Sequence, residues 1–251
     1  MFSGGHDSLV STHFSASILD KIGLDYVVYH GNTGIGIEET RQFVRDVCEV
    51  NGWVLAERKP PKYTDSYEYL VKRFGFPGPS RQSHQIMYRR LKERALRKFV
   101  TYECKSSPHA RENILLITGI RKQESKIRMG YIHESSKDGS RVWCNPIFYW
   151  SKNKCEDYML QHNLPRNAVK DKICISGECL CGAFASYSEL MEIKQEYPDA
   201  YNEIQRLHSL AKENGHPWGW STGPTDWYKN HPPGQVDMFM CVGCESKYNE
   251  E

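Results

Sequence analysis

Long hydrophobic runs are absent from this chain of 251 residues. No run approaches the length that a transmembrane helix needs, and the first residues, Met1-Phe2-Ser3-Gly4-Gly5, do not form a signal peptide. A large excess of charge of one sign is also missing, because the formal net charge is +2, too little to indicate a nucleic-acid partner by itself. We therefore expect a cytoplasmic protein that makes no contact with a membrane.

The sequence also contains no internal repeat and no low-complexity segment. Its composition is that of an ordinary globular protein, with 39% hydrophobic and 25% charged residues. The length suits one large α/β domain, or one domain with a small appendage.

Short apolar runs alternate with helical patterns in the first half of the chain. The runs predict strands over residues 26–29, 53–56 and 114–117. Helical patterns cover residues 9–22, 37–50 and 84–102, and the last of these is strongly basic. The simplest interpretation of that basic helix is a solvated face, and a surface that meets phosphate or nucleic acid is the alternative. Helices between strands predict βαβ units, and hence an α/β fold with a parallel, doubly wound, Rossmann-like sheet.

The character of the sequence changes near Cys174. Residues 187–214 predict helices broken at Pro198, and residues 215–243 are rich in Gly, Pro and Trp without periodicity. Such a stretch rarely packs by itself, so we expect a cross-link that ties it to the core. We expect a nucleotide-binding α/β domain over residues 1–172 and a helical, cysteine-rich metal region over residues 173–251.

A glycine-rich turn precedes the first predicted helix. Its residues are Ser3-Gly4-Gly5-His6-Asp7-Ser8. A turn of this kind presents free backbone N–H groups and the positive end of the helix dipole, and glycine removes the Cβ atoms that would block a phosphate. The two serines add hydroxyl donors, and Asp7 is expected to cap the helix or help hold Mg²⁺. A simple Ser/Gly turn with a helix cap is the alternative.

This turn resembles the SGGxDS PP-loop of the adenine nucleotide α-hydrolase superfamily, which binds the phosphates of ATP or phosphoadenosine phosphosulfate (PAPS). The family has a β-strand directly before the loop, whereas only Met1 and Phe2 precede it here. The strand is therefore built from elsewhere, or the true N-terminus is missing. His6 stands where many relatives have Lys, so a neutral imidazole replaces a fixed charge.

Three further motifs, in the same order as in the family, make the chain similar to PAPS reductases. His30-Gly31-Asn32-Thr33-Gly34 with Glu38-Glu39-Thr40 resembles the motif "DTG…ET", with Asn32 in place of Asp. Residues 118–128 match "GxRxxES..R", and residues 145–150 with 164–167 resemble "PI.dW…LP.N". Several ordered motifs at strand ends are more specific than one.

The resemblance implies a nucleotide site at the carboxyl ends of the strands, where the loop and the later motifs converge. Arg121 and Arg128 would contact phosphate or sulfate oxygens, and Asp7 and Arg121 would also be catalytic. The residues expected to bind the nucleotide are Ser3, Gly4, Gly5, His6, Asp7, Ser8, Asn32, Thr33, Gly34, Gly119, Arg121, Glu124 and Arg128.

Five of the nine cysteines form two groups near the end of the chain. They are Cys174, Cys179 and Cys181, then Cys241 and Cys244. Four thiolates suit one tetrahedral zinc or one [4Fe–4S] cluster, and spacing alone does not choose between these or exclude one spare thiol. The resemblance to PAPS reductases and to DNA phosphorothioation enzymes favours iron–sulfur, with zinc as the alternative.

The preferred function is an enzyme that holds ATP with Mg²⁺ and adenylylates an acceptor for sulfur transfer. The acceptor could be a nucleic acid, as in the phosphorothioation relatives, and a sulfur-donor protein could supply the sulfur. A divergent PAPS or APS reductase is one alternative. The family's reductases carry a mobile nucleophilic cysteine at the C-terminus, whereas Gly177-Glu178-Cys179 lies within this chain. A non-catalytic nucleotide-binding module with a structural zinc is the other.

Overall fold

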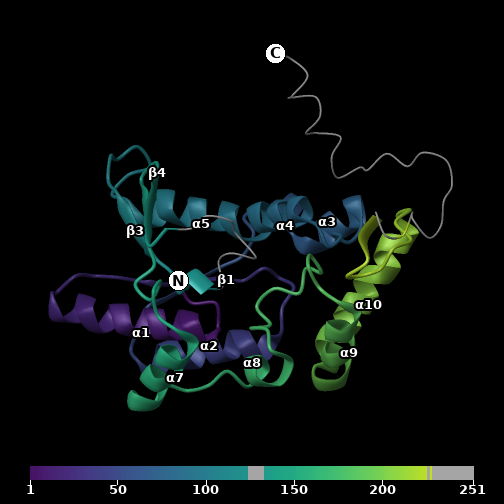
Figure 1. Cartoon of the computed structure of the whole chain (residues 1–251). Coiled ribbons are helices and arrows are strands. Elements are labelled where there is room, and N and C mark those ends of the chain that lie inside the picture. The colour runs from purple at the N-terminus through teal and green to yellow at the C-terminus, as the bar shows by residue number, and fades with distance from the viewer. Residues whose placement is uncertain (124–132, 225–226, 228–251) are drawn as a thin grey trace. The chain divides into compact units, whose positions relative to one another are not determined.

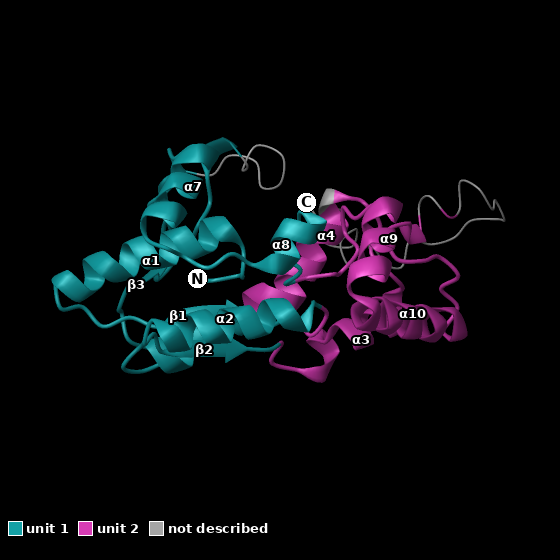
Figure 2. Cartoon of the chain, turned by 90° about the horizontal axis from the view of Figure 1, so that it is seen from below, with its two compact units in different colours: residues 1–32, 36–59, 95–178 teal, residues 33–35, 60–94, 179–251 magenta. Residues whose placement is uncertain are grey.

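The computed structural model describes residues 1–123, 133–224 and 227, which fall into two compact units (Figure 2). Unit 1 consists of residues 1–32, 36–59 and 95–178, and unit 2 of residues 33–35, 60–94 and those from 179 on. The chain passes between the units several times, so both are discontinuous in sequence. A separate nucleotide-binding domain over residues 1–172 stays a prediction.

Unit 1 contains all the strands of the described part of the chain, in two small sheets. The first sheet is parallel, with Val28 opposite Leu55, and the second has the order β3-β5-β4, with β3 parallel and β4 antiparallel to β5. The strands are β1 (Val28–Gly31), β2 (Leu55–Arg58), β3 (Ile114–Ile117), β4 (Ser135–Asp138) and β5 (Arg141–Cys144). The α/β fold with parallel strand pairs is therefore as predicted.

Met1 and Phe2 lie between the two sheets. The backbone nitrogen of Phe2 donates to the carbonyl of Tyr29 in β1 at 2.9 Å, and the nitrogen of Met1 donates to the carbonyl of Ile117 in β3 at 2.7 Å. These two residues take the position of the strand that was expected before the glycine-rich loop. They deliver the loop to the carboxyl ends of β1 and β3.

Helices cover both faces of these strands. Val28 packs into a core cluster with Leu9, Val44 and Met159. The next residue, Tyr29, packs into a second cluster with Leu96, Phe99 and Val100. Successive side chains of a strand point to opposite faces, so the two clusters lie on the two sides of the sheet. The helical segments of unit 1 are α1 (His6–Lys21), α2 (Glu38–Val50), α5 (Arg94–Phe99), η3 (Val100–Cys104), α7 (Lys152–Gln161) and α8 (Ala168–Ile173) (Figure 1).

Unit 2 is helical in its described part. Helix α10 packs against α3 and α9, and α9 begins with a capping box in which Ser186 and Glu189 bond each other's backbone (Figure 1). Its elements are η1 (Tyr63–Asp65), α3 (Tyr67–Phe74), α4 (Arg81–Tyr88), η2 (Arg89–Glu93), α9 (Tyr187–Glu196) and α10 (Pro198–Glu213). The predicted break at Pro198 is confirmed, and the predicted basic helix over 84–102 contains two π-helical turns, η2 and η3.

Two buried tryptophans hold the beginning of the Gly-, Pro- and Trp-rich stretch. The Trp218 indole donates to the Phe76 carbonyl at 3.0 Å, and the Trp220 indole donates to the Leu180 carbonyl at 2.7 Å. A Cβ on Gly75 would lie 2.5 Å from the Trp218 ring. Over residues 216–224, side-chain packing therefore holds the stretch that was expected to need a metal cross-link, and residues from 228 on lie outside the described part.

Among the helices of the described residues, none is both long and apolar enough to cross a membrane.

Candidate functional site

The glycine-rich loop turns directly into α1. Gly4 has a φ of +80°, and a Cβ there would lie 2.6 Å from Cγ2 of Thr40, so only glycine fits this position. Gly5 is the N-cap of α1. The first four N–H groups of a helix have no partner within the helix, and they attract an anion. Residues 3–8 therefore form the glycine-rich turn into a helix that the sequence predicts, and the binding of an anion there stays a prediction.

The hydroxyl groups of the loop stabilise its shape. Ser8 Oγ donates to the Gly5 carbonyl at 2.8 Å, accepts from the Ser3 backbone nitrogen at 3.3 Å and lies 3.1 Å from Ser3 Oγ. These contacts close the turn from Ser3 to Ser8.

Asp7 forms an ion pair with Arg121. The Arg121 Nε lies 2.9 Å from Asp7 Oδ2, and Arg121 is 4% exposed. The interpretation of Asp7 as a helix cap is wrong, because the N-cap is Gly5 and no side chain bonds the N-terminus of α1. Asp7 lies inside the first turn of α1, and its carboxylate forms the ion pair with Arg121 instead of capping the helix.

The segment after β3 packs on the backbone of the loop. A Cβ on Gly119 would lie 2.5 Å from the Asp7 carbonyl oxygen, and Ser11 Oγ donates to the Thr118 carbonyl at 2.9 Å. Thr118 also bonds Asn145 through its hydroxyl, and Asn145 donates to the His133 carbonyl at 2.8 Å. The predicted convergence of this segment on the loop is confirmed.

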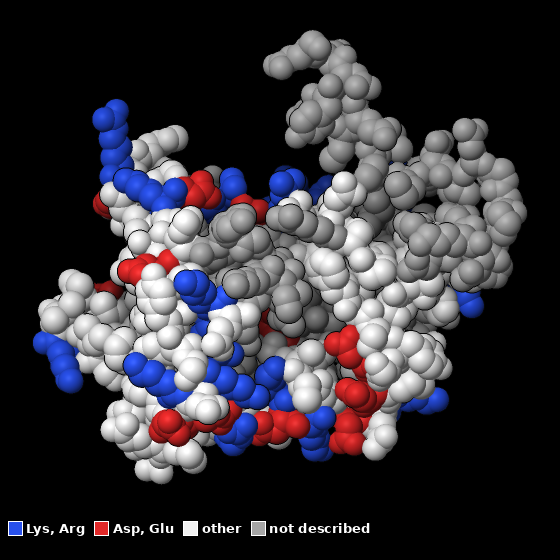
Figure 3. Space-filling model, in the orientation of Figure 1, with Lys and Arg blue, Asp and Glu red and all other residues white. Residues whose placement is uncertain are grey.

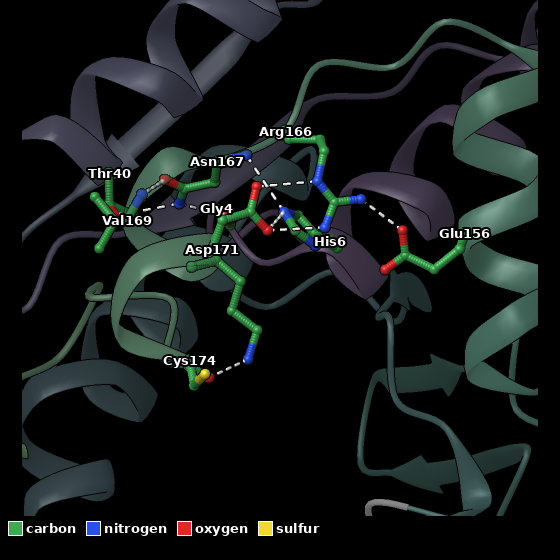
Figure 4. A network of polar contacts seen from close by, with 10 residues as sticks. Gly4, His6, Thr40, Glu156, Arg166, Asn167, Val169, Asp171 and Cys174 are labelled. Carbon is green, nitrogen blue, oxygen red and sulfur yellow. Dashed lines mark hydrogen bonds and ion pairs between the residues drawn. The ribbon is translucent and has the colours of Figure 1, made fainter.

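Asn167 connects the loop to α8, of which it is the N-cap (Figure 4). Its Nδ2 donates to the Gly4 carbonyl at 2.8 Å and to Thr40 Oγ1 at 3.3 Å, and its Oδ1 accepts from the Val169 nitrogen at 3.0 Å. Thr40 Oγ1 in turn donates to the Ser176 carbonyl at 2.6 Å. The loop, α2 and the segment after α8 are thereby held together.

His6 is 9% exposed, and its pKa is lowered from 6.5. Burial lowers its pKa most, and the nearby charge of Arg166 lowers it further, against the opposing effect of Asp171 at 3.8 Å. Its Nε2 accepts from the Asn167 backbone nitrogen at 3.3 Å, which requires an unprotonated Nε2. Figure 4 shows Arg166 between Asp171 and Glu156, with which it forms ion pairs. The lowered pKa favours the neutral imidazole that the sequence leads us to expect at this position.

The remaining predicted nucleotide-binding residues divide into three groups. Asn32 in unit 1 donates to Glu57 Oε1 at 2.6 Å. Thr33 and Gly34 belong to unit 2, where Thr33 Oγ1 donates to the Ile35 carbonyl at 3.1 Å. Glu124 and Arg128 lie outside the described residues, so their role stays a prediction.

The predicted metal centre is not shown by the described residues. They contain no group of three or more His, Cys, Asp and Glu side chains that could hold a metal ion. Cys174 is exposed in unit 1, Cys179 and Cys181 are in unit 2, and Cys241 and Cys244 lie outside the described part. A centre that includes the last two stays a prediction.

Thr40 and Asn167 were not among the predicted site residues, although both contact the loop. Each belongs to a motif that the sequence displays, Glu38-Glu39-Thr40 and Leu164-Pro165-Arg166-Asn167. The family motifs therefore marked both residues in the sequence. The contact of Asn167 with Gly4 could not be predicted from the sequence, because the two residues are 163 positions apart.

Residues 1–247 match the model of one protein family, the phosphoadenosine phosphosulfate reductase domain. Among solved structures, phosphoadenylyl-sulfate (PAPS) reductase from Candida auris in complex with phosphate is 21% identical over 67% of this chain and 74% of that chain, with a TM-score of 0.43. That similarity is too low to support an argument about the site. No curated protein matches the chain.

Proposed function

The chain belongs to the phosphoadenosine phosphosulfate reductase family, and on this premise we propose that it binds the phosphates of an adenine nucleotide at residues 3–8. The observation that supports the proposal is the geometry of residues 3–8 and Gly119, which we call the cradle. The N-terminus of α1 offers free N–H groups, and Gly4 and Gly119 stand where a Cβ would collide with Thr40 and with the Asp7 backbone.

Each residue of the cradle has a role in this proposal. The N–H groups from Gly5 to Ser8 hold phosphate oxygens, and Arg121 orients the carboxylate of Asp7, which would hold the Mg²⁺ of the nucleotide. We propose that Asn32, in unit 1, contacts the same nucleotide, whereas contacts of Thr33, Gly34, Glu124 and Arg128 with a nucleotide stay predictions from the sequence.

The proposed reaction is adenylylation followed by sulfur transfer. An acceptor oxygen attacks the α-phosphorus of ATP and pyrophosphate leaves, so that the acceptor carries AMP. A sulfur nucleophile then displaces AMP and forms the bond between sulfur and the acceptor. Hydrogen bonds from the loop stabilise the charge that develops on the leaving pyrophosphate, and a bound Mg²⁺ would supply further charge stabilisation there.

Reduction of a sulfonucleotide is the second candidate, since the family is named for it. That reaction needs a cysteine that can move to the sulfur atom. The sequence Gly177-Glu178-Cys179 is held in place at its first two residues: Gly177 accepts a hydrogen bond from the Ile37 nitrogen at 2.8 Å, and Glu178 is 6% exposed. This packing favours sulfur transfer over reduction by Cys179.

A [4Fe–4S] cluster or zinc remains part of the proposal as a centre held by four of the five clustered cysteines. Cys179 and Cys181 lie one residue apart in unit 2, where the Tyr67 hydroxyl donates to the Cys181 carbonyl at 2.8 Å. Burial, and then the charges of Cys181 and Cys179, raise the pKa of Tyr67 well above its ordinary value. These two thiols would supply half of the four ligands that a [4Fe–4S] cluster or a zinc site needs.

An anionic acceptor, such as a nucleic acid, is supported by a cluster in unit 2. Asp65 is 1% exposed, and its Oδ1 lies 2.8 Å from Arg90 Nη1 and 2.5 Å from Arg94 Nη1. Two guanidinium groups thus face one carboxylate and stay partly exposed, which suits a phosphodiester. Elsewhere, acidic and basic side chains are interspersed, as Figure 3 shows for one face.

Two assays on the purified full chain decide between the candidates. ATP–pyrophosphate exchange in the presence of acceptor is expected if the protein adenylylates. Thiol-dependent release of sulfite from PAPS without exchange would instead identify a reductase. Nucleotide binding with neither activity, together with stoichiometric zinc, would identify a binding module.

A further inference from the structure

The Asn167 side chain directs all of its polar groups toward the protein. Its two N–H groups meet the Gly4 carbonyl and Thr40 Oγ1, its oxygen accepts from Val169, and the residue is 1% exposed. An amide side chain has two N–H donors and one carbonyl oxygen, so no donor is left for a ligand. Asn167 can therefore affect ligand binding only by positioning the groups to which its side chain is hydrogen-bonded.

One of those groups is the peptide between Gly4 and Gly5. The carbonyl oxygen and the N–H of a planar trans peptide point in opposite directions, and the described residues contain no cis peptide. Because Asn167 holds the Gly4 oxygen, the Gly5 N–H points away from Asn167. No described residue accepts a hydrogen bond from that N–H.

This peptide is free to rotate in the absence of such a contact. Glycine lacks a Cβ and adopts positive and negative φ with similar ease, so a peptide between two glycines has a low barrier to reversal. Reversal would turn the Gly4 oxygen outward and present partial negative charge, instead of an N–H donor, to a phosphate. The hydrogen bond of 2.8 Å from Asn167 opposes that reversal.

We infer that Asn167 is a positioning residue that selects the phosphate-binding orientation of the Gly4–Gly5 peptide. The inference rests on the proposed binding of a nucleotide at residues 3–8. Asn167 then determines how well the loop discriminates ligands with phosphate groups from those without, although it touches none of them.

The variant that tests this is Asn167→Asp. Aspartate keeps the size of the side chain and the oxygen that caps α8, and Asp is as good an N-cap as Asn. It replaces the N–H donor with an oxygen that faces the Gly4 oxygen. Asn51→Asp is the matched control, because Asn51 also donates from Nδ2 to a carbonyl, that of Val47, at 2.8 Å.

The readout is the affinity of the full chain for ATP and for pyrophosphate, measured by calorimetry, with the melting temperature of each variant. Asn167→Asp should bind both ligands at least about tenfold more weakly, since a buried carbonyl loses its donor, while Asn51→Asp binds like the wild type. In ¹⁵N-labelled protein, pyrophosphate should shift the Gly5 amide resonance in the wild type and in Asn51→Asp, but not in Asn167→Asp. A purely structural role would not single out this amide.

The outcomes separate the inference from the proposed function. Wild-type protein that binds neither ATP nor pyrophosphate overturns the proposed function, and the inference with it, before any variant is made. Wild-type binding with unchanged affinity in Asn167→Asp overturns the inference alone. If Asn167→Asp does not fold, Thr40→Val takes its place, because it removes the oxygen that holds the second N–H of Asn167. We expect a loss of roughly threefold there, and an unchanged affinity would overturn the inference.

Discussion

Arg121 differs from an arginine at the surface because its guanidinium is buried and its Nε faces Asp7. Lysine has a single charged nitrogen on a flexible stem, so it cannot hold Asp7 and reach a phosphate with a fixed fork of donors. Arg121→Lys should therefore weaken ATP binding by on the order of 1.5–3 kcal/mol, measured by calorimetry. The control is Arg141→Lys, a change at another buried and paired arginine of unit 1, on β5. Equal losses in both variants would remove Arg121 from the site.

Glu57 makes the stability of the fold depend on pH in the acidic range. Its carboxylate accepts from Arg45 Nε at 2.9 Å and from Asn32 at 2.6 Å, and these contacts, Arg45 first, lower its pKa from 4.5 to about 2. Because the folded pKa is the lower one, the stabilisation is complete above about pH 4.5 and is lost as the pH falls toward 2. The melting temperature should therefore fall across this range, and less steeply in Glu57→Gln. Glu49→Gln, at an exposed position of α2, should keep the wild-type slope.

The stretch after α10 depends on glycines that make room for tryptophan rings. Gly75 has a φ of +74°, and its Cβ would lie 2.5 Å from Trp218. Gly23 has a similar φ, +67°, with nothing within 4 Å. Gly23→Ala should cost about 1 kcal/mol from backbone strain alone. Gly75→Ala should cost more, because the ψ of −175° at Gly75 is open essentially to glycine only and because overpacking against Trp218 adds about 1–3 kcal/mol. Thermal unfolding measures the difference, and equal losses would mean that the Trp218 contact contributes little.

The elements that the sequence predicted are those with a strong local pattern. Residues 114–117, Ile-Leu-Leu-Ile, form β3 where expected, and apolar spacing located α2 to within one residue. The hairpin of β4 and β5 was missed because Ser135 to Asp138 is polar and fully exposed, so it shows no alternation. Asp138-Gly139 is nevertheless a turn signal, and Gly139 has a φ of +60°.

The site was predictable where one motif forms it and not where distant motifs meet. The turn of residues 3–8 was predicted from glycine and serine spacing, because a turn into a helix is a local structure, and its binding of phosphate stays a prediction. The pair of Asp7 with Arg121 and the contact of Asn167 with Gly4 depend on how strands and helices pack, and a single sequence does not contain those distances. Asp7 was consequently interpreted as a cap.

The metal content of the whole protein tests the largest remaining prediction. We expect Cys241 and Cys244 to share a centre with two of the earlier clustered cysteines, so Cys241→Ser should lose metal, whereas Cys104→Ser should keep it. Metal analysis after anaerobic purification measures this, and the visible spectrum identifies iron–sulfur, since zinc is colourless. Full metal content in Cys241→Ser would refute a shared centre, and zinc without iron would refute only its iron–sulfur form.

The interleaving of the two units sets an order of events during synthesis of the chain. The hydroxyl of Thr40 cannot donate to its acceptor, the carbonyl of Ser176, until a further 136 residues have been synthesised. At ribosomal speed this delay is roughly 10 s. Gly4 is made well before Asn167, so the hydrogen bond between them forms only after the 163 residues that separate them in sequence. A fragment that ends at residue 172 would lack Ser176 and Gly177 and thus the partners of Thr40 and Ile37, so the loop should be studied in the full chain.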